Sequence, residues 1–130
     1  MNKDKTGELI LLENDVVELR RLLNDKASKN LQYLNRLQEE ISKAQVVARS
    51  ELPNTVVTMH STATVIDLKD NEKDSYTLVY PWEADVDKGK ISILAPIGTA
   101  LIGYREGDEI NWNVPGGMTR LRILSVEQPA

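Results

Sequence analysis

The segment from Ile91 to Gly117 constrains the fold most, because proline and glycine occur in it where particular backbone conformations are required. The apolar run ISIL predicts a strand, and Pro96 follows it with a fixed φ that suits the first turn of a helix. IGTALI leaves room for about two helical turns before Gly103, which suits a C-terminal cap with positive φ. The runs DEINWNV and MTRLRILSV flank Pro115–Gly117, a pattern typical of a β-hairpin.

The preceding residues also predict strands. From Val56 to Leu68 β-branched residues dominate and the apolar period approaches two, which indicates two short strands separated near His60. Lys69–Asp74 predicts a polar turn, Tyr76–Tyr80 a strand that a proline ends, and DVDKGK a further turn. The C-terminal part is therefore predicted to be an antiparallel sheet wrapped round one short helix.

The N-terminal part carries a helical period instead. Five apolar residues are spaced alternately three and four apart, as on one seam of a helix: Leu34, Leu37, Ile41, Ala44 and Ala48. The pattern stops at Ser50–Asn54, where Pro53 cannot continue a helix. We therefore predict an N-terminal unit over residues 1–50 and a C-terminal domain over residues 51–130, which makes the fold class α+β.

A seam of this kind requires a partner helix. Val16, Leu19 and Leu23 provide one, with Asn14 as the predicted N-cap. The polar run NDKASKN connects the two helices, which predicts a short antiparallel helical hairpin, or short coiled coil. Leu9–Leu12 fits an added strand and a hydrophobic docking segment equally well.

Composition limits the classes of function. At 130 residues the chain suits one compact unit or a small domain with an appendage, and the absence of cysteine excludes disulfides and thiolate chemistry. A net charge of -4 disfavours autonomous binding to nucleic acid. No apolar run is long enough for a signal peptide or a membrane span, so we expect a cytoplasmic protein without membrane contact. Composition does not decide between a monomer and a homo-oligomer.

Few residues fit catalysis or metal binding. His60 is the only histidine, and no hydrolase, metalloprotease, P-loop or dinucleotide motif accompanies it, so a structural hydrogen bond is the favoured interpretation. Glu106, Asp108 and Glu109 surround a glycine and fit turn and strand-entry roles better than metal ligation. We therefore expect neither a catalytic residue nor a metal or cofactor.

Two groups fit recognition of another macromolecule. Tyr76, Tyr80 and Trp82 form either an aromatic recognition patch or ordinary packing, and packing is favoured. Arg120 and Arg122 alternate along the last predicted strand and so share one face of the sheet. That face either contacts an acidic protein surface or is simply solvated.

The chain resembles the C-terminal domain of the Gre transcript-cleavage factors. The resemblance rests on the strand and proline-started helix of Ile91–Gly103, the strand entry at Gly107 and Asp108, and the hairpin at Pro115–Gly117, and it extends over roughly residues 8 to 127. Within that superfamily the chain looks most like the Rnk proteins, the regulators of nucleoside diphosphate kinase. The resemblance implies an FKBP-like domain that binds RNA polymerase at the rim of its secondary channel.

The resemblance also suggests docking residues. Gre factors use a Ser-Pro pair at the junction between strand and helix, and this chain matches the proline with Pro96 but has Ala95 in place of serine. The Rnk proteins look similar here, with Ala-Pro-x-Gly, which corresponds to Ala95, Pro96, Ile97 and Gly98. These four residues, with the arginines of the last strand, are our candidates for polymerase docking.

Transcript cleavage is not expected to carry over. In Gre factors, carboxylates at the tip of a long coiled coil help to hold a catalytic magnesium ion, whereas the tip here has Asp25 flanked by Lys26 and Lys29. A helix of order 20 residues would also reach only about 30 Å. The sequence therefore predicts a non-enzymatic transcription regulator that binds RNA polymerase. The alternatives are a protein-interaction adaptor or dimer that affects nucleotide metabolism indirectly, and an FKBP-type isomerase, which the lack of phenylalanine disfavours.

Overall fold

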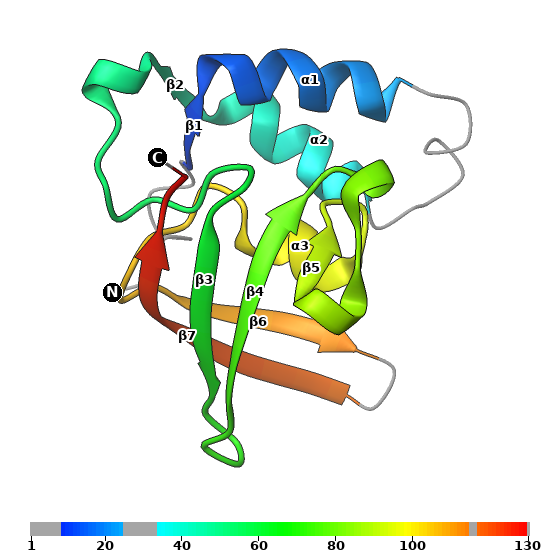
Figure 1. The fold of residues 1–130 in the computed structure, drawn as a ribbon, viewed down its shortest axis with the longest axis vertical. Coiled ribbons are helices and arrows are strands. Elements are labelled where there is room, and N and C mark those ends of the chain that lie inside the picture. The colour runs from blue at the N-terminus through cyan, green and yellow to red at the C-terminus, as the bar shows by residue number, and fades with distance from the viewer. Residues whose placement is uncertain (1–8, 25–33, 115–116, 130) are drawn as a thin grey trace.

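The computed structural model describes residues 9–24, 34–114 and 117–129 (Figure 1). Its helices and 3-10 turns are α1 (Glu13–Leu23), α2 (Leu34–Lys43), η3 (Arg49–Glu51), η4 (Pro81–Glu83), η5 (Val86–Lys88) and α3 (Pro96–Leu101). Its strands are β1 (Ile10–Leu12), β2 (Gln45–Val47), β3 (Thr62–Asp67), β4 (Lys73–Val79), β5 (Lys90–Ser92), β6 (Glu109–Val114) and β7 (Gly117–Glu127). The predicted α+β class is confirmed.

Five strands form the main sheet in the order β5-β4-β3-β7-β6. Four of them pair antiparallel, but β5 runs parallel to β4, so the prediction of an entirely antiparallel sheet is wrong at this strand. The cause is the segment of residues 80–89, which folds into η4 and η5 and carries the chain back to the level of Thr77 before β5 begins. The resulting mixed sheet curls round α3 (Figure 1).

Two strand boundaries also differ from the prediction. β4 begins at Lys73, within the predicted polar turn, because its exposed first residues still pair with β3. Val56 forms only an isolated bridge to Arg105, so the first of the two strands predicted around His60 is absent from the described residues. The backbone of His60 has φ +68, which turns the chain just before β3.

The helix α3 matches its prediction. It begins at Pro96 and ends at Leu101, and Gly103 follows with φ +84. A Cβ at Gly103 would also lie 2.8 Å from the Cβ of Leu9, so two constraints favour glycine there. This glycine lets the N-terminal segment lie directly against the C-terminal part of the chain.

The N-terminal strands explain two further corrections. β1 pairs parallel with β2 in a separate two-stranded sheet, so Leu9–Leu12 contributes a strand but does not extend the main sheet. The amide of Gln45 donates to the carbonyl of Leu9 at 2.7 Å, and α2 therefore ends at Lys43 instead of continuing to Ser50. α1 starts directly after β1 with Leu12 at its N-cap position, so the prediction of Asn14 as the cap is wrong.

One hydrophobic core joins the two parts of the chain. α1 and α2 lie side by side over one end of the main sheet (Figure 1). Leu19, Leu37 and Ile41 from these helices belong to the same buried cluster as Val57 and Ile123. Each such side chain contributes about 1.5 to 3 kcal/mol when it is fully buried, so the helices are held to the sheet by packing. Among the described residues, no helix has both the length and the apolar content needed to span a membrane.

Candidate functional site

The junction between β5 and α3 carries the predicted docking residues. Hydrogen bonds from the amides of Leu94 and Ala95 to the Oγ and carbonyl of Ser92, at 3.0 and 2.9 Å, form a tight turn. Pro96 then occupies the first position of α3. Proline has no backbone N–H, but an N–H at this position would have no acceptor within the helix, so no helical hydrogen bond is lost. The hydrogen bonds and the proline therefore restrict the backbone conformation of the junction before any partner binds.

The four junction residues differ in accessibility. Pro96 is exposed, Ala95 and Ile97 are half-buried, and Gly98 is buried. A Cβ at Gly98 would lie 2.4 Å from the carbonyl oxygen of Ser92, well inside contact distance. Close packing of α3 on β5 thus accounts for the glycine, and Pro96 is the residue of this group that a partner can reach most freely.

The two predicted arginines lie on the open face of β7. Arg122 forms an ion pair with Glu109 at 2.6 Å, and Nε of Arg120 donates to Oδ1 of Asn111 at 3.1 Å. The hydrogen bond from Arg122 lowers the pKa of the Glu109 carboxyl. Both guanidinium groups are therefore already bonded to the neighbouring strand β6.

The structure does not bring the arginines and the junction together. Arg122 pairs with Ile66, which pairs in turn with Lys73 at the start of β4. The junction instead follows Ser92, which pairs with Val79 at the other end of β4. Two strands, β4 and β3, also separate β5 from β7. The predicted hairpin-tip residues Asp25, Lys26 and Lys29 lie outside the described residues.

The aromatic residues divide between packing and exposure. Tyr80 is buried and stacks on Trp82, with ring centroids 5.2 Å apart and planes at 9°. His60 meets Tyr80 edge-on, and its Nε2 lies 2.8 Å from Oε1 of Glu83, so the predicted structural hydrogen bond of His60 is present. That bond lowers the pKa of Glu83. Tyr76 is half-buried on β4, and Trp82 is exposed.

The acidic residues near Gly107 are occupied by structural contacts. Asp108 accepts the amide of Arg105 at 3.0 Å, and Glu106 accepts the amide of Val126 at 2.8 Å. These bonds support the predicted turn and strand-entry roles. In the described part of the chain, no three histidine, aspartate or glutamate side chains are grouped so that they could hold a metal ion.

Asp15 is a buried acidic residue whose hydrogen bond was not predicted from the sequence. Its Oδ2 accepts the amide of Met59 at 3.0 Å, which ties the first turn of α1 to the turn before β3. Burial raises the pKa of the Asp15 carboxyl. The available signal was its position four residues before Leu19, which places an acid on the apolar face of the helix.

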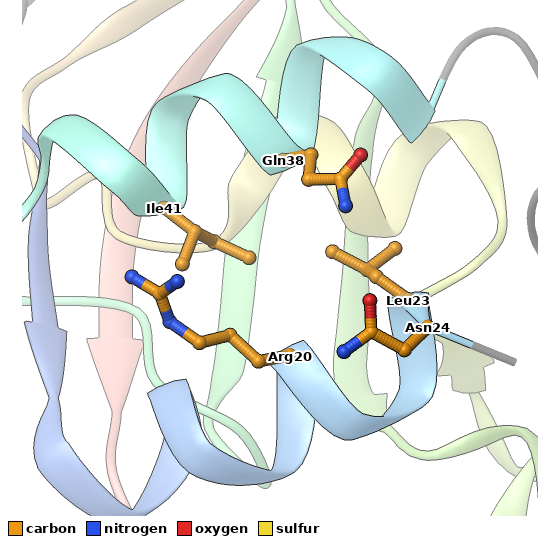
Figure 2. Close-up of a pocket in the computed structure, with 5 residues that line it drawn as sticks. All are labelled: Arg20, Leu23, Asn24, Gln38 and Ile41. Carbon is orange, nitrogen blue, oxygen red and sulfur yellow. The ribbon is translucent and has the colours of Figure 1, made fainter.

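A small hollow between α1 and α2 was also not predicted. Its volume is about 90 Å³, roughly the liquid volume of three water molecules. Figure 2 shows side chains from the C-terminal end of α1 reaching toward those of α2 across this space. The lining residues are Arg20, Leu23, Asn24, Gln38 and Ile41. The hollow arises from the spacing of two packed helices, which no residue pattern specifies.

Comparisons with known proteins agree with this geometry. Residues 52–128 match the family model "Transcription elongation factor, GreA/GreB, C-term". The chain is 37% identical over 120 residues to the regulator of nucleoside diphosphate kinase of Escherichia coli K12, which covers 92% of this chain and 88% of that protein. It is 40% identical over 100 residues to transcription elongation factor GreA of Bartonella henselae, covering 77% of this chain and 64% of that factor.

A solved structure supports the same assignment. The prokaryotic transcription elongation factor GreA/GreB from Nitrosomonas europaea aligns with a TM-score of 0.74 at 39% identity, covering 92% of this chain and 98% of that one. These three relatives are named as regulators or elongation factors. The matched region contains the junction at Pro96 and the β6–β7 hairpin, on which the predicted resemblance rests. This chain therefore belongs to the GreA/GreB family of transcription elongation factors.

Proposed function

We propose that this protein is a non-enzymatic transcription regulator that binds RNA polymerase at the rim of the secondary channel and does not stimulate transcript cleavage. The observation that supports docking is the preformed β5–α3 junction within a GreA/GreB C-terminal domain. Pro96 is exposed there, on a turn held by two hydrogen bonds to Ser92. A rigid, exposed turn loses little conformational entropy on binding, which favours its use as a contact.

The N-terminal helices support the absence of cleavage. Within the described residues α1 and α2 span 11 and 10 residues, which corresponds to about 15 to 17 Å each at a rise of 1.5 Å per residue. In the sequence, the connection between them has one acidic residue, Asp25, flanked by Lys26 and Lys29. Magnesium favours several oxygen ligands, and a single carboxylate among cations provides a poor set.

The packing of these helices supports the same proposal. Their apolar faces are buried against the sheet, and the bond from Met59 to Asp15 ties α1 to the C-terminal domain. We infer that the helices act at the channel entrance, beside the docking domain, and do not extend to the catalytic centre.

Binding to core RNA polymerase tests the docking half of the proposal. Pro96→Glu is the informative variant, because acidic residues are tolerated in the first turn of a helix while a charge at an apolar contact must be desolvated. We expect this variant to bind at least about tenfold more weakly, which corresponds to about 1.4 kcal/mol. Lys69→Glu is the control, because Lys69 is exposed in the turn after β3, at the opposite end of the sheet.

Equal retention of Pro96→Glu and wild type would reject the junction as the contact. A wild-type protein that failed to bind at low salt would reject the polymerase proposal as a whole. In that case solution mass and partner identification would test the adaptor or dimer alternative.

A further inference from the structure

Trp82 is an exposed aromatic residue held in a fixed orientation. Its side chain is 72% exposed, and the nearby Val86 is 82% exposed. A single exposed apolar residue is ordinary, but this indole stacks on the buried ring of Tyr80. The carboxylate of Glu83 accepts the amide of Tyr80 at 3.1 Å and bonds to His60, which holds the turn η4 in place.

The stacking leaves one face of the indole ring available. Tyr80 covers the inner face with nearly parallel planes, so the large exposed fraction of Trp82 belongs to its outer face and edges. The rotamer is restricted before a partner arrives. Tryptophan in this state provides contact area at low entropic cost, which is why it is common among residues that dominate binding energy.

Trp82 lies beside the docking junction because of the parallel pairing of β4 and β5. Val79 pairs with Ser92, and the amide of Ile93 donates to the carbonyl of Val79 at 2.7 Å. The C-terminal ends of the two strands therefore lie at the same end of the sheet, about 4.8 Å apart. The chain leaves β4 toward Trp82 and leaves β5 toward Pro96, and Figure 1 shows the segment after β4 folded beside β5 and α3.

The charges around Trp82 indicate the chemistry of a partner. The segment of residues 81–90 carries three acidic residues, Glu83, Asp85 and Asp87, against two lysines, Lys88 and Lys90. Lys88 lies 4.0 Å from Asp85, while Asp87 forms no ion pair with the described residues. An open indole face in a segment with an excess of acidic side chains favours a guanidinium or ammonium group, through a cation–π contact and charge complementarity.

We propose that Trp82 extends the docking surface at Pro96 and that its outer face receives an arginine or lysine side chain of RNA polymerase. This inference rests on the proposed polymerase binding and identifies a second contact within it. Val86 supplies adjacent apolar area in the same contact. The parallel ends of β4 and β5 thus present a proline and a tryptophan to one partner surface.

Binding of three Trp82 variants to core RNA polymerase tests the inference. Trp82→Phe keeps an aromatic face, Trp82→Leu keeps apolar area without one, and Trp82→Ala removes both. We expect losses of about tenfold or more for alanine and leucine and a smaller loss for phenylalanine. Leu124→Ala is the control, because Leu124 is exposed on β7 and β3 separates it from β4. The melting temperatures of all four proteins are measured as well, and a binding loss counts toward the inference only in a variant that is fully folded at the temperature of the binding assay.

The outcomes separate this inference from the proposed function. Wild-type binding that persists unchanged in Trp82→Ala overturns the Trp82 contact and leaves polymerase binding intact. Equal losses in the leucine and phenylalanine variants overturn the cation–π contact. No binding by the wild type overturns both proposals, and a change of solution mass in Trp82→Ala would show that this surface contacts a second copy of the chain instead.

Discussion

Substituting Gly98 by alanine separates the structural role of the docking junction from its role in binding. Glycine inside a helix normally costs about 1 kcal/mol relative to alanine, so the change would ordinarily stabilise the protein. Here the added Cβ would lie 2.4 Å from the carbonyl oxygen of Ser92 and 3.1 Å from the Cα of Ile93. Both contacts are with backbone, so α3 or β5 must move. We therefore predict a change of the opposite sign.

The expected loss follows from two opposing contributions. Overpacking of a well-packed interior costs about 1 to 3 kcal/mol, and the gain in helix propensity offsets about 1 kcal/mol of that cost. The net loss is up to about 2 kcal/mol, which lowers the melting temperature by up to about 8 °C for a domain of this size. Relaxing the side chain of Leu78, also 3.1 Å away, would not relieve the backbone contacts.

Thermal and urea unfolding monitored by circular dichroism measure this change. Pro96→Glu is the comparison in the same helix, because it alters the exposed docking position without a steric conflict. It should keep nearly the wild-type melting temperature and lose polymerase binding. A Gly98→Ala protein about 1 kcal/mol more stable than wild type would refute the packing argument, since that is the result for an unconstrained helical glycine.

Other substitutions test the attachment of the N-terminal helices. Asp15→Ala should destabilise the protein by about 1 to 3 kcal/mol in urea unfolding, because it leaves the buried amide of Met59 without its acceptor, whereas Asp15→Asn can keep that bond. Burial raises the pKa of Asp15 above 3.8, so its contribution to stability is fully present below about pH 3.8 and is lost as the pH rises through the raised value. The stability of Asp15→Asn relative to wild type should therefore increase from about pH 4 upward, and a flat difference would contradict this. Gly103→Ala should cost at least about 1 kcal/mol, because φ is +84 and the new Cβ meets Leu9; unchanged urea unfolding would show that β1 does not pack there.

Local backbone requirements explain what the sequence predicted well. Pro96 and Gly103 bound α3 because each satisfies a conformational demand within its own turn. The β6–β7 pairing followed in the same way from alternation around Pro115–Gly117. Such signals depend on neighbouring residues, so they can be recognised in a single chain.

Long-range contacts explain what was missed. α2 ends where Gln45 bonds to Leu9, and β5 is parallel because residues 80–89 fold back beside β4. Neither contact has a local signature. The candidate site shows the same limit. Pro96 was predicted from its motif, and Trp82 was considered as part of an aromatic patch, but packing was favoured for it. Its exposure and its place at the same end of the sheet as Pro96 follow only from the stack on Tyr80 and the parallel register.

Binding to core RNA polymerase together with transcript cleavage tests the central claim most directly. The purified protein would be titrated against a long-hairpin GreA factor on core polymerase, and stalled elongation complexes in the same samples would report cleavage. We predict competitive binding that lowers GreA-stimulated cleavage and produces none alone. Cleavage stimulated by this protein alone, or binding that GreA does not displace, would contradict the account.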